Sequence, residues 1–168
     1  MAQQTPGRGF GGSTRPTTSS PGYRDRAGYG NSPEDAARID TSSIVFGEQI
    51  DPRLFADIAE ECAKAVSPQG RGHDVNKGTQ LRRFYDELVM LQGKVGSSDE
   101  RYRVQAPFIQ MLKAKVAYAV GRKKVDTNFE QLLRRVIEQA TDHGRLAQAK
   151  LFMEAFMAFY KEIGRAHV

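Results

Sequence analysis

The sequence predicts an all-α protein, a compact bundle of about five helices that follows a disordered N-terminal tail. After residue 43, apolar side chains recur at spacings of three and four residues almost throughout, which is the period of an amphipathic helix. No segment alternates apolar and polar residues as a half-buried strand does. The 168 residues, 39% of them hydrophobic and 27% charged, suffice for one globular domain. We therefore expect one helical domain over residues 43–168.

Residues 1–42 have the composition of a disordered tail. They hold 7 of the 16 glycines and 4 of the 7 prolines, and Ile39 is their only large aliphatic residue beyond Met1. Such a segment buries too little apolar surface to offset the entropy lost on ordering it. Its residues 7–12, GRGFGG, resemble arginine- and glycine-rich sequence that contacts RNA, and a solvated linker is the other interpretation.

Two helices are expected in the first half of the domain, after a segment of residues 43–50 that is too short to classify. Asp51 and Pro52 supply an N-cap and a first-turn proline for the first helix. Its apolar side consists of Leu54, Phe55, Ile58, Ala59, Cys62 and Val66. Thr79 can cap the second helix. The apolar stripe of that helix consists of Leu81, Phe84, Tyr85, Leu88, Leu91 and Val95.

Three more helices complete the expected bundle. Pro107 suits the first turn of a helix, so the third helix is expected over residues 107–123, after a separate turn that starts at residue 98 or 99. Thr127 begins a capping-box sequence, TNFE, which opens the fourth helix. Gly144 is expected to end that helix, and the fifth follows it. The inward-facing residues of these helices are, in turn, Phe108, Ile109, Leu112, Val116, Ala119 and Val120; Phe129, Leu132, Leu133, Val136, Ile137 and Ala140; and Leu151, Phe152, Ala155, Phe156, Phe159 and Ile163.

The sequence contains no motif for catalysis or metal binding. Cys62 is the only cysteine, and His73, His143 and His167 share no local spacing with it or with carboxylates. We therefore expect a protein that is not an enzyme and that uses no cofactor, no metal and no small-molecule substrate. A small RNase, for which the three histidines are the only support, ranks last among the functions considered.

The composition also bears on location. No run of 18 apolar residues occurs, and the N-terminus lacks the basic and apolar segments of a secretory signal. A single cysteine is typical of a protein from a reducing compartment. We expect a cytoplasmic protein that does not associate with a membrane.

Basic charge is concentrated in the middle of the chain. The net charge is +5 and the pI is about 9.4. Residues 76–124 contain eleven Lys and Arg against four Asp and Glu, whereas residues 43–75 contain three against six and residues 125–168 contain six of each. The excess positive charge of the molecule therefore lies on the second and third helices. This favours a polyanionic partner such as RNA.

The helical period arranges these cations. Lys115 and Arg122 lie seven residues apart on the third helix with Tyr118 between them, while Lys113 and Lys124 are expected on the opposite flank. Cations on both flanks of a helix suit a phosphate backbone, although charges that merely solvate the helix would look the same. On the second helix, Asp86 should partly neutralise Arg82, and Glu87 should partly neutralise Arg83.

Three blocks of sequence carry a family resemblance. Residues 77–85 (KGTQLRRFY), 112–122 (LKAKVAYAVGR) and 152–160 (FMEAFMAFY) follow one another in this order and span most of the helical region. Together they resemble the small subunit of type III-A CRISPR effector (Csm) complexes. The long tail and the bulky Phe156 and Phe159 depart from the family pattern.

The resemblance implies a non-catalytic RNA-binding subunit of an antiviral defence complex. Several copies would stack along the effector filament beside its backbone subunits and brace the duplex of guide RNA and target RNA, while other subunits cleave. Base pairing would read the target, so the subunit would contact phosphates and sugars. With the clustered charge, the resemblance gives these candidate RNA-binding residues: Lys77, Gln80, Arg82, Arg83, Lys113, Lys115, Arg122, Lys123 and Lys124.

A second function remains open from the sequence. A helical adaptor that binds only other proteins would also show an amphipathic bundle and lack an active site. Its basic residues would then only keep it soluble. The concentration of cations in residues 76–124 favours the RNA-binding interpretation over this one.

Overall fold

The computed structural model describes residues 38–67 and 74–166. In this part of the chain there are five α-helices, a short π-helix and no strand. The elements are η2 (Leu54–Ile58), α1 (Ala59–Val66), α2 (Gly78–Val95), α3 (Asp99–Gly121), α4 (Thr127–Gln139) and α5 (His143–Ala166). The prediction of an all-α fold with about five helices is thus confirmed. Most of the predicted tail, residues 1–37, lies outside the described residues, and the division of the chain at residue 43 stays a prediction.

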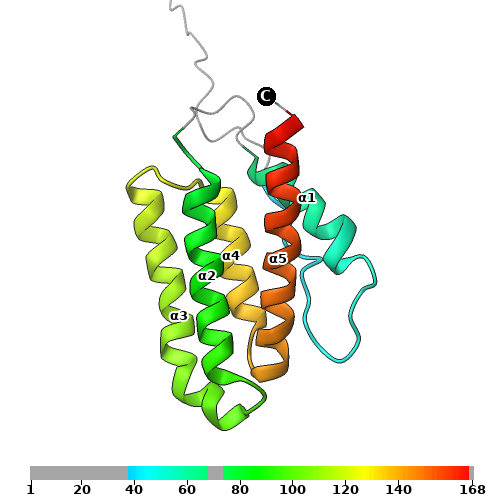
Figure 1. Cartoon of the computed structure of the whole chain (residues 1–168), viewed down its shortest axis with the longest axis vertical. Coiled ribbons are helices and arrows are strands. Elements are labelled where there is room, and N and C mark those ends of the chain that lie inside the picture. The colour runs from blue at the N-terminus through cyan, green and yellow to red at the C-terminus, as the bar shows by residue number, and fades with distance from the viewer. Residues whose placement is uncertain (1–37, 68–73, 167–168) are drawn as a thin grey trace, which may run out of the picture. The chain divides into compact units, whose positions relative to one another are not determined.

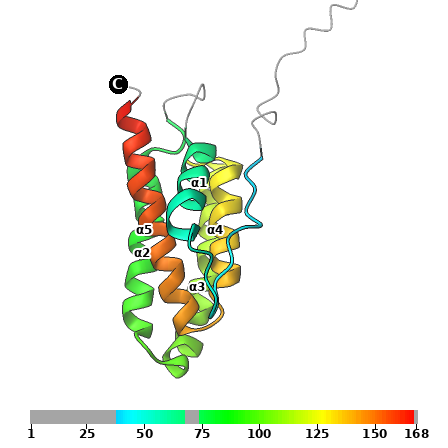
Figure 2. The same cartoon turned by 90° about the vertical axis from the view of Figure 1, so that its right-hand side faces the viewer.

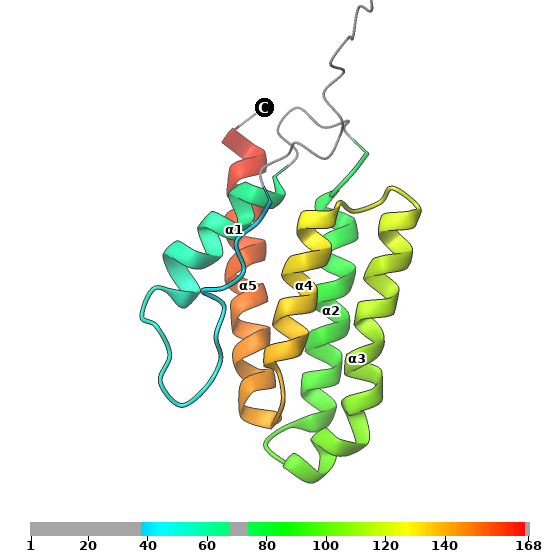
Figure 3. The ribbon, with the colours of Figure 1, turned by 180° about the vertical axis from the view of Figure 1, so that it is seen from behind.

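Helices α2 to α5 form an antiparallel bundle in which each helix packs against two others (Figure 1). Helix α2 contacts α3 and α5, and α4 contacts the same two helices from the other side of the bundle. Short connections between successive helices produce this alternating direction. Helix α1 and η2 lie outside this group and pack on α5, with α1 also touching α4 (Figure 3).

The chain before η2 is an irregular segment with turns and bends, and its first part runs along α4 (Figure 2). The Ile39 amide donates to Asn128 Oδ1 near the start of α4, and the Ile44 carbonyl accepts from Arg135 Nε at 3.0 Å. Ile39, Ile44 and Phe46 are buried. The hydrophobic core therefore includes Ile39, which the sequence analysis placed in the tail.

Aromatic residues fill the centre of the bundle. The ring of Phe129 lies 5.6 Å from that of Phe84 and 6.2 Å from that of Phe156, and Phe156 stacks on Tyr160 at 5.8 Å. Most of the residues expected to face inward are buried or packed against the core. Phe108 and Leu151 are exceptions.

Phe108 and Leu151 are 53% and 47% exposed, so the prediction that they face inward is wrong. On α3, the buried stripe is Ile109, Leu112 and Val116, and Phe108 falls on its edge. On α5, Leu151 lies almost opposite buried Met153. Each helical residue turns by about 100°, so side chains two positions apart point about 200° away from each other.

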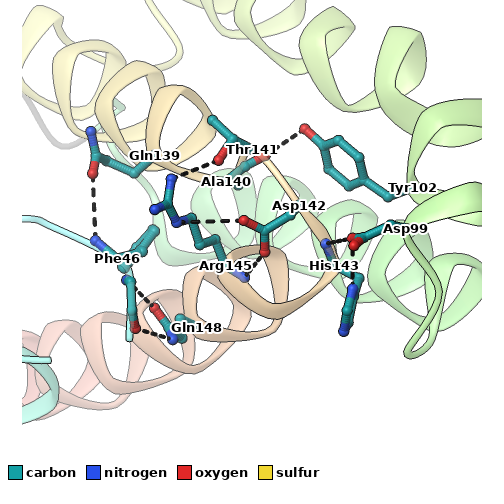
Figure 4. Close-up of polar contacts among 11 residues, drawn as sticks. Phe46, Asp99, Tyr102, Gln139, Ala140, Thr141, Asp142, His143, Arg145 and Gln148 are labelled. Carbon is teal, nitrogen blue, oxygen red and sulfur yellow. Dashed lines mark hydrogen bonds and ion pairs between the residues drawn. The ribbon is translucent and has the colours of Figure 1, made fainter. Parts of the chain in front are cut away.

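Helix α3 begins at Asp99, eight residues before the expected start, and contains Pro107 inside it. Its first turn is capped by the Ser98 hydroxyl, which accepts from the Arg101 amide at 3.3 Å. The Tyr102 hydroxyl donates to the Ala140 carbonyl at 2.6 Å and ties this turn to the end of α4 (Figure 4). These contacts keep the segment before Pro107 helical although the proline cannot donate a backbone hydrogen bond.

The other helix starts differ from the sequence predictions by a few residues. Helix α2 begins at Gly78 and has no side-chain cap, so Thr79 lies inside it. The cap of α4 is Asp126, whose Oδ1 accepts from the Phe129 amide at 2.8 Å. Gly144 lies in the first turn of α5 and does not end α4, because Asp142 Oδ1 caps α5 by accepting from the Arg145 amide at 2.8 Å (Figure 4). In each of the last two cases a carboxylate satisfies an amide that the helix leaves free.

Candidate nucleic-acid interface

A groove lies between the first half of α2 and the second half of α3. Its volume is about 370 Å³. The groove is lined by Gln80, Arg83, Phe84, Glu87, Lys115, Tyr118, Ala119, Arg122 and Lys124. Five of the nine candidate RNA-binding residues therefore meet in one place, and we call this the α2–α3 groove.

Tyr118 and Arg122 form a stacked pair at the groove. The guanidinium carbon of Arg122 lies 5.7 Å from the centre of the Tyr118 ring, and Arg122 Nη1 donates to the tyrosine hydroxyl at 3.2 Å. The Tyr118 side chain is nevertheless 67% exposed. A cation over an aromatic face is attracted to the electrons of the ring, so the pair holds both side chains in a defined arrangement.

Four of the candidate cations are engaged in ion pairs. Lys77 Nζ lies 2.6 Å from Asp74 Oδ1, and Arg82 Nε lies 3.5 Å from Asp86 Oδ1, which confirms the expected Arg82 pair. Lys113 Nζ lies 3.5 Å from Glu138 Oε1 on α4. Lys115 Nζ pairs with Glu87 Oε1 across the groove. The exposed pairs of Lys77 and Arg82 contribute only about 0–1 kcal/mol each, so an RNA phosphate can compete for them.

The other four cations make no ion pair within residues 38–67 and 74–166. These unpaired cations are Arg83, Arg122, Lys123 and Lys124, and all four are exposed. The prediction that Glu87 neutralises Arg83 on the same helix is wrong, because Glu87 pairs with Lys115 of α3 instead. Arg83 is thereby left free for an external anion.

The structure separates the remaining candidates from the groove. Lys113 lies on the α4 side of α3 and its side chain is only 24% exposed. Arg82 lines a different hollow of about 670 Å³ between α2 and α5, beside Tyr85 and Lys161. Lys77 pairs with Asp74 ahead of α2, and neither Lys77 nor Lys123 lines the groove.

Lys124 lies in the groove, contrary to the prediction that it shares a flank with Lys113. Helix α3 ends at Gly121, and Lys123 then adopts a left-handed backbone with φ of 55°. The Lys124 amide donates to Ala119 O at 2.9 Å and the Lys123 amide to Val120 O at 2.8 Å. This Schellman turn reverses the chain, so helical spacing no longer describes where Lys124 points.

Asn76 supports this turn, and the sequence analysis did not single it out. It is buried, with φ of 57°. Its amide donates to the Lys124 carbonyl at 3.0 Å, and its Oδ1 accepts from the Asp126 amide at 2.9 Å. Its Nδ2 donates to the Val66 carbonyl at 2.9 Å, and its carbonyl accepts from the Tyr160 hydroxyl. Asparagine tolerates the left-handed region, which was the one signal in the sequence for such a role.

Two buried side chains have raised pKa values. Burial raises the pKa of Tyr160 to about 12, with the Asp126 carboxylate acting in the same direction. Burial also raises the pKa of Cys62 to about 12, which favours the protonated thiol over the nucleophilic thiolate.

His143 is the one histidine within the described residues, and it begins α5. Its Nδ1 lies 2.6 Å from Asp99 Oδ1, and the same oxygen accepts from the His143 amide at 3.1 Å (Figure 4). These hydrogen bonds hold the pKa of Asp99 below its ordinary value. The pair joins the starts of α3 and α5. No group of three or more His, Cys, Asp or Glu that could hold a metal ion occurs in residues 38–67 and 74–166.

None of the helices in the described part of the chain is long and apolar enough to cross a membrane.

The family model for Csm2 Type III-A matches residues 49–166, from the segment before η2 to the end of α5. No curated protein and no solved structure matches the chain significantly.

Proposed function

Because the chain belongs to the Csm2 Type III-A family, and is thus a small subunit of a type III-A CRISPR (Csm) complex, we propose that it binds RNA through the α2–α3 groove. In this proposal it braces the duplex of guide RNA and target RNA without cutting it. The observation that carries the proposal is the groove itself, where Arg83, Lys115, Arg122 and Lys124 meet a single acid, Glu87.

The chemistry of the groove suits an RNA backbone. Lysine and arginine bind phosphate oxygens whatever the base, so a subunit that must accept any target can use them. The A-form RNA duplex is recognised largely by its shape and its phosphate and hydroxyl groups, and base pairing with the guide supplies the sequence specificity. Three of the four cations in the groove have no competing carboxylate within the described residues.

A second candidate function is that of a protein adaptor, and one observation favours it. Helix α3 carries exposed apolar side chains along one side, namely Val104, Phe108 and Met111. A cluster of exposed large apolar residues marks a surface that another protein covers. We propose that neighbouring subunits of the complex, including further copies of this chain, dock here while RNA occupies the groove. The two functions are then compatible, and the cytoplasm is the expected location.

The test compares two variants with equal loss of charge. One replaces Arg83, Arg122 and Lys124 with alanine, and the control replaces Lys64, Lys161 and Arg165, which do not line the groove. Binding of each protein to guide–target RNA duplex is measured by fluorescence anisotropy at fixed salt, after circular dichroism has shown that both are folded.

We expect the groove variant to bind more weakly than the control variant, which should stay close to the parent. Equal losses in both variants would mean that only net charge matters. Unchanged binding by the groove variant would refute the proposed RNA-binding function and favour the adaptor.

A further inference from the structure

We propose that the α2–α3 groove is a subsite for one unpaired nucleotide, with its base stacked on Tyr118 and its phosphate held by Arg83, Arg122 and Lys124. This inference rests on the proposed RNA-binding function and specifies the form of RNA that the groove prefers. Four observations carry it: the exposure of Tyr118, its pairing with Arg122, the size of the groove and the chemistry of its walls.

Tyr118 is more exposed than any other large hydrophobic side chain in the described residues. An aromatic ring that is 67% exposed must present much of its surface to solvent although Arg122 lies near it. Nucleic-acid bases stack on such rings without regard to sequence, because every base has an aromatic face. The ring therefore offers a platform that any unpaired base can use.

Arg122 prepares this platform before RNA arrives. Its hydrogen bond to the tyrosine hydroxyl and its position 5.7 Å from the ring centre restrict the motion of Tyr118. Binding to an already ordered side chain costs less entropy than binding to a mobile one. A guanidinium has five N–H donors, and two of them can form a bidentate hydrogen bond to a phosphate. Arg122 can therefore bind a phosphate while it keeps its hydrogen bond to Tyr118.

The groove has the size and the polarity for a nucleotide. Its volume of about 370 Å³ falls within the range of small-molecule sites. Phe84 and Ala119 supply apolar wall, and the Gln80 carboxamide supplies both a donor and an acceptor for a base edge. Arg83 and Lys124 lie on the same groove and provide positive charge for the phosphate.

Paired bases cannot use this site. In a duplex both faces of each base are stacked on neighbours, and the Watson–Crick edge is occupied. Moving such a base into the groove would cost a few kcal/mol of unstacking and unpairing. A bulged or single-stranded nucleotide avoids most of this cost, so the groove should discriminate between unpaired and fully paired RNA, which can place only its phosphates there.

Exposed tyrosine and arginine are also common at protein interfaces. The lining of the groove favours RNA, because four cations face only one carboxylate, and that carboxylate is already paired with Lys115. A protein partner would need an unusually acidic surface to match it.

The test uses three RNA probes of equal length: a single strand, a perfect duplex, and a duplex with one bulged nucleotide. The bulge contains 2-aminopurine, whose fluorescence is quenched on stacking. The parent is compared with Tyr118→Leu, which keeps apolar bulk but removes the ring, and with Tyr118→Phe, which keeps the ring but removes the hydroxyl. Neither change should affect folding because the side chain is exposed, and circular dichroism checks this.

Tyr118→Leu should weaken binding of the single strand and the bulged duplex about tenfold, which corresponds to about 1.4 kcal/mol, and should abolish the quenching. The perfect duplex should change less than about twofold, and Tyr118→Phe should retain most of the affinity and the quenching. Equal losses on all three probes, or no loss on any, would overturn the subsite.

The outcomes separate the subsite from the proposed function. If the Arg83, Arg122 and Lys124 variant loses RNA and Tyr118→Leu does not, the groove binds RNA but has no stacking site. If neither variant loses RNA, the proposed function itself fails. If Tyr118→Leu keeps all three RNAs but releases subunits that co-purify with the parent, the ring belongs to a protein contact and the subsite is refuted.

Discussion

The division between paired and unpaired cations predicts the salt dependence of RNA binding. The unpaired cations are Arg83, Arg122, Lys123 and Lys124, and each can neutralise one phosphate without first breaking an ion pair. For a single strand, log K falls with log salt by about 0.7 for each phosphate that is neutralised. Four contacts therefore give a slope of about −2.8, and at 0.1 M salt each contact contributes roughly fivefold to the affinity.

Two matched substitutions test this arithmetic. Arg83→Ala removes an unpaired cation, so the slope should become about −2.1 and the affinity at 0.1 M salt should fall roughly fivefold. Lys113→Ala removes a cation on the side of α3 that faces α4, where it is paired with Glu138. The slope and the affinity of this variant should therefore match those of the parent. Fluorescence anisotropy with a labelled single-stranded RNA over 50–400 mM KCl measures both quantities.

Two measured outcomes would contradict this prediction. If Lys113→Ala lowered the slope as much as Arg83→Ala, the groove would not be the contact surface. If the parent slope were about −5.6, all eight candidate cations would be engaged, and RNA would have opened the four ion pairs seen in the free protein.

Three further predictions follow from individual contacts. Glu87→Gln removes the one acid of the groove and frees Lys115, so RNA affinity should rise and its salt slope should steepen by about 0.7; unchanged binding would show that Lys115 stays out of reach. Lys123 has a left-handed backbone, which costs less for glycine, so Lys123→Gly should raise the unfolding free energy by about 1 kcal/mol while it weakens RNA binding. Thermal melting measures the stability and anisotropy measures the binding; a less stable variant would contradict the assigned turn. The pKa of Tyr160 is raised to about 12 by burial, so its contribution to stability is complete below pH 10 and is lost as the pH rises toward 12. Chemical denaturation should show the parent losing about 2 kcal/mol more than Tyr160→Phe over that range, with Cys62 titrating equally in both; parallel losses would argue against the assignment.

The sequence alone predicted the fold class because apolar residues recur at helical spacing in all the helices that form the bundle, most clearly in α4 and least clearly in α3. The sequence predicted the starts of the helices less well, because local capping signals compete with contacts made by residues that are distant in the sequence. Pro107 is a good first-turn residue, yet Tyr102 extends the helix ahead of it by bonding to Ala140, 38 residues away. Thr127 has the right neighbours for a cap, yet Asp126 occupies that role. No local rule weighs these alternatives.

The candidate site was predicted in composition but not in arrangement. Clustered charge identified the cations of α2 and α3, and the seven-residue spacing correctly joined Lys115 to Arg122. The pairing of Glu87 with Lys115, 28 residues apart, depends on the register of two antiparallel helices, which no local spacing encodes. The position of Lys124 depends on a left-handed turn that helical geometry cannot anticipate.

Asn76 explains how the backbone at the Lys124 edge of the groove is held in place without a ligand. A buried polar side chain is costly unless its hydrogen bonds are made, and Asn76 satisfies its backbone and side-chain groups through Val66, Lys124, Asp126 and Tyr160. These bonds fasten the turn after α3 to the end of α1 and to α5, so the backbone at Lys124 is held by the core. The backbone that carries Lys124 is then ordered before a ligand arrives, so less binding free energy is lost to ordering this part of the groove than if Lys124 lay on a mobile loop.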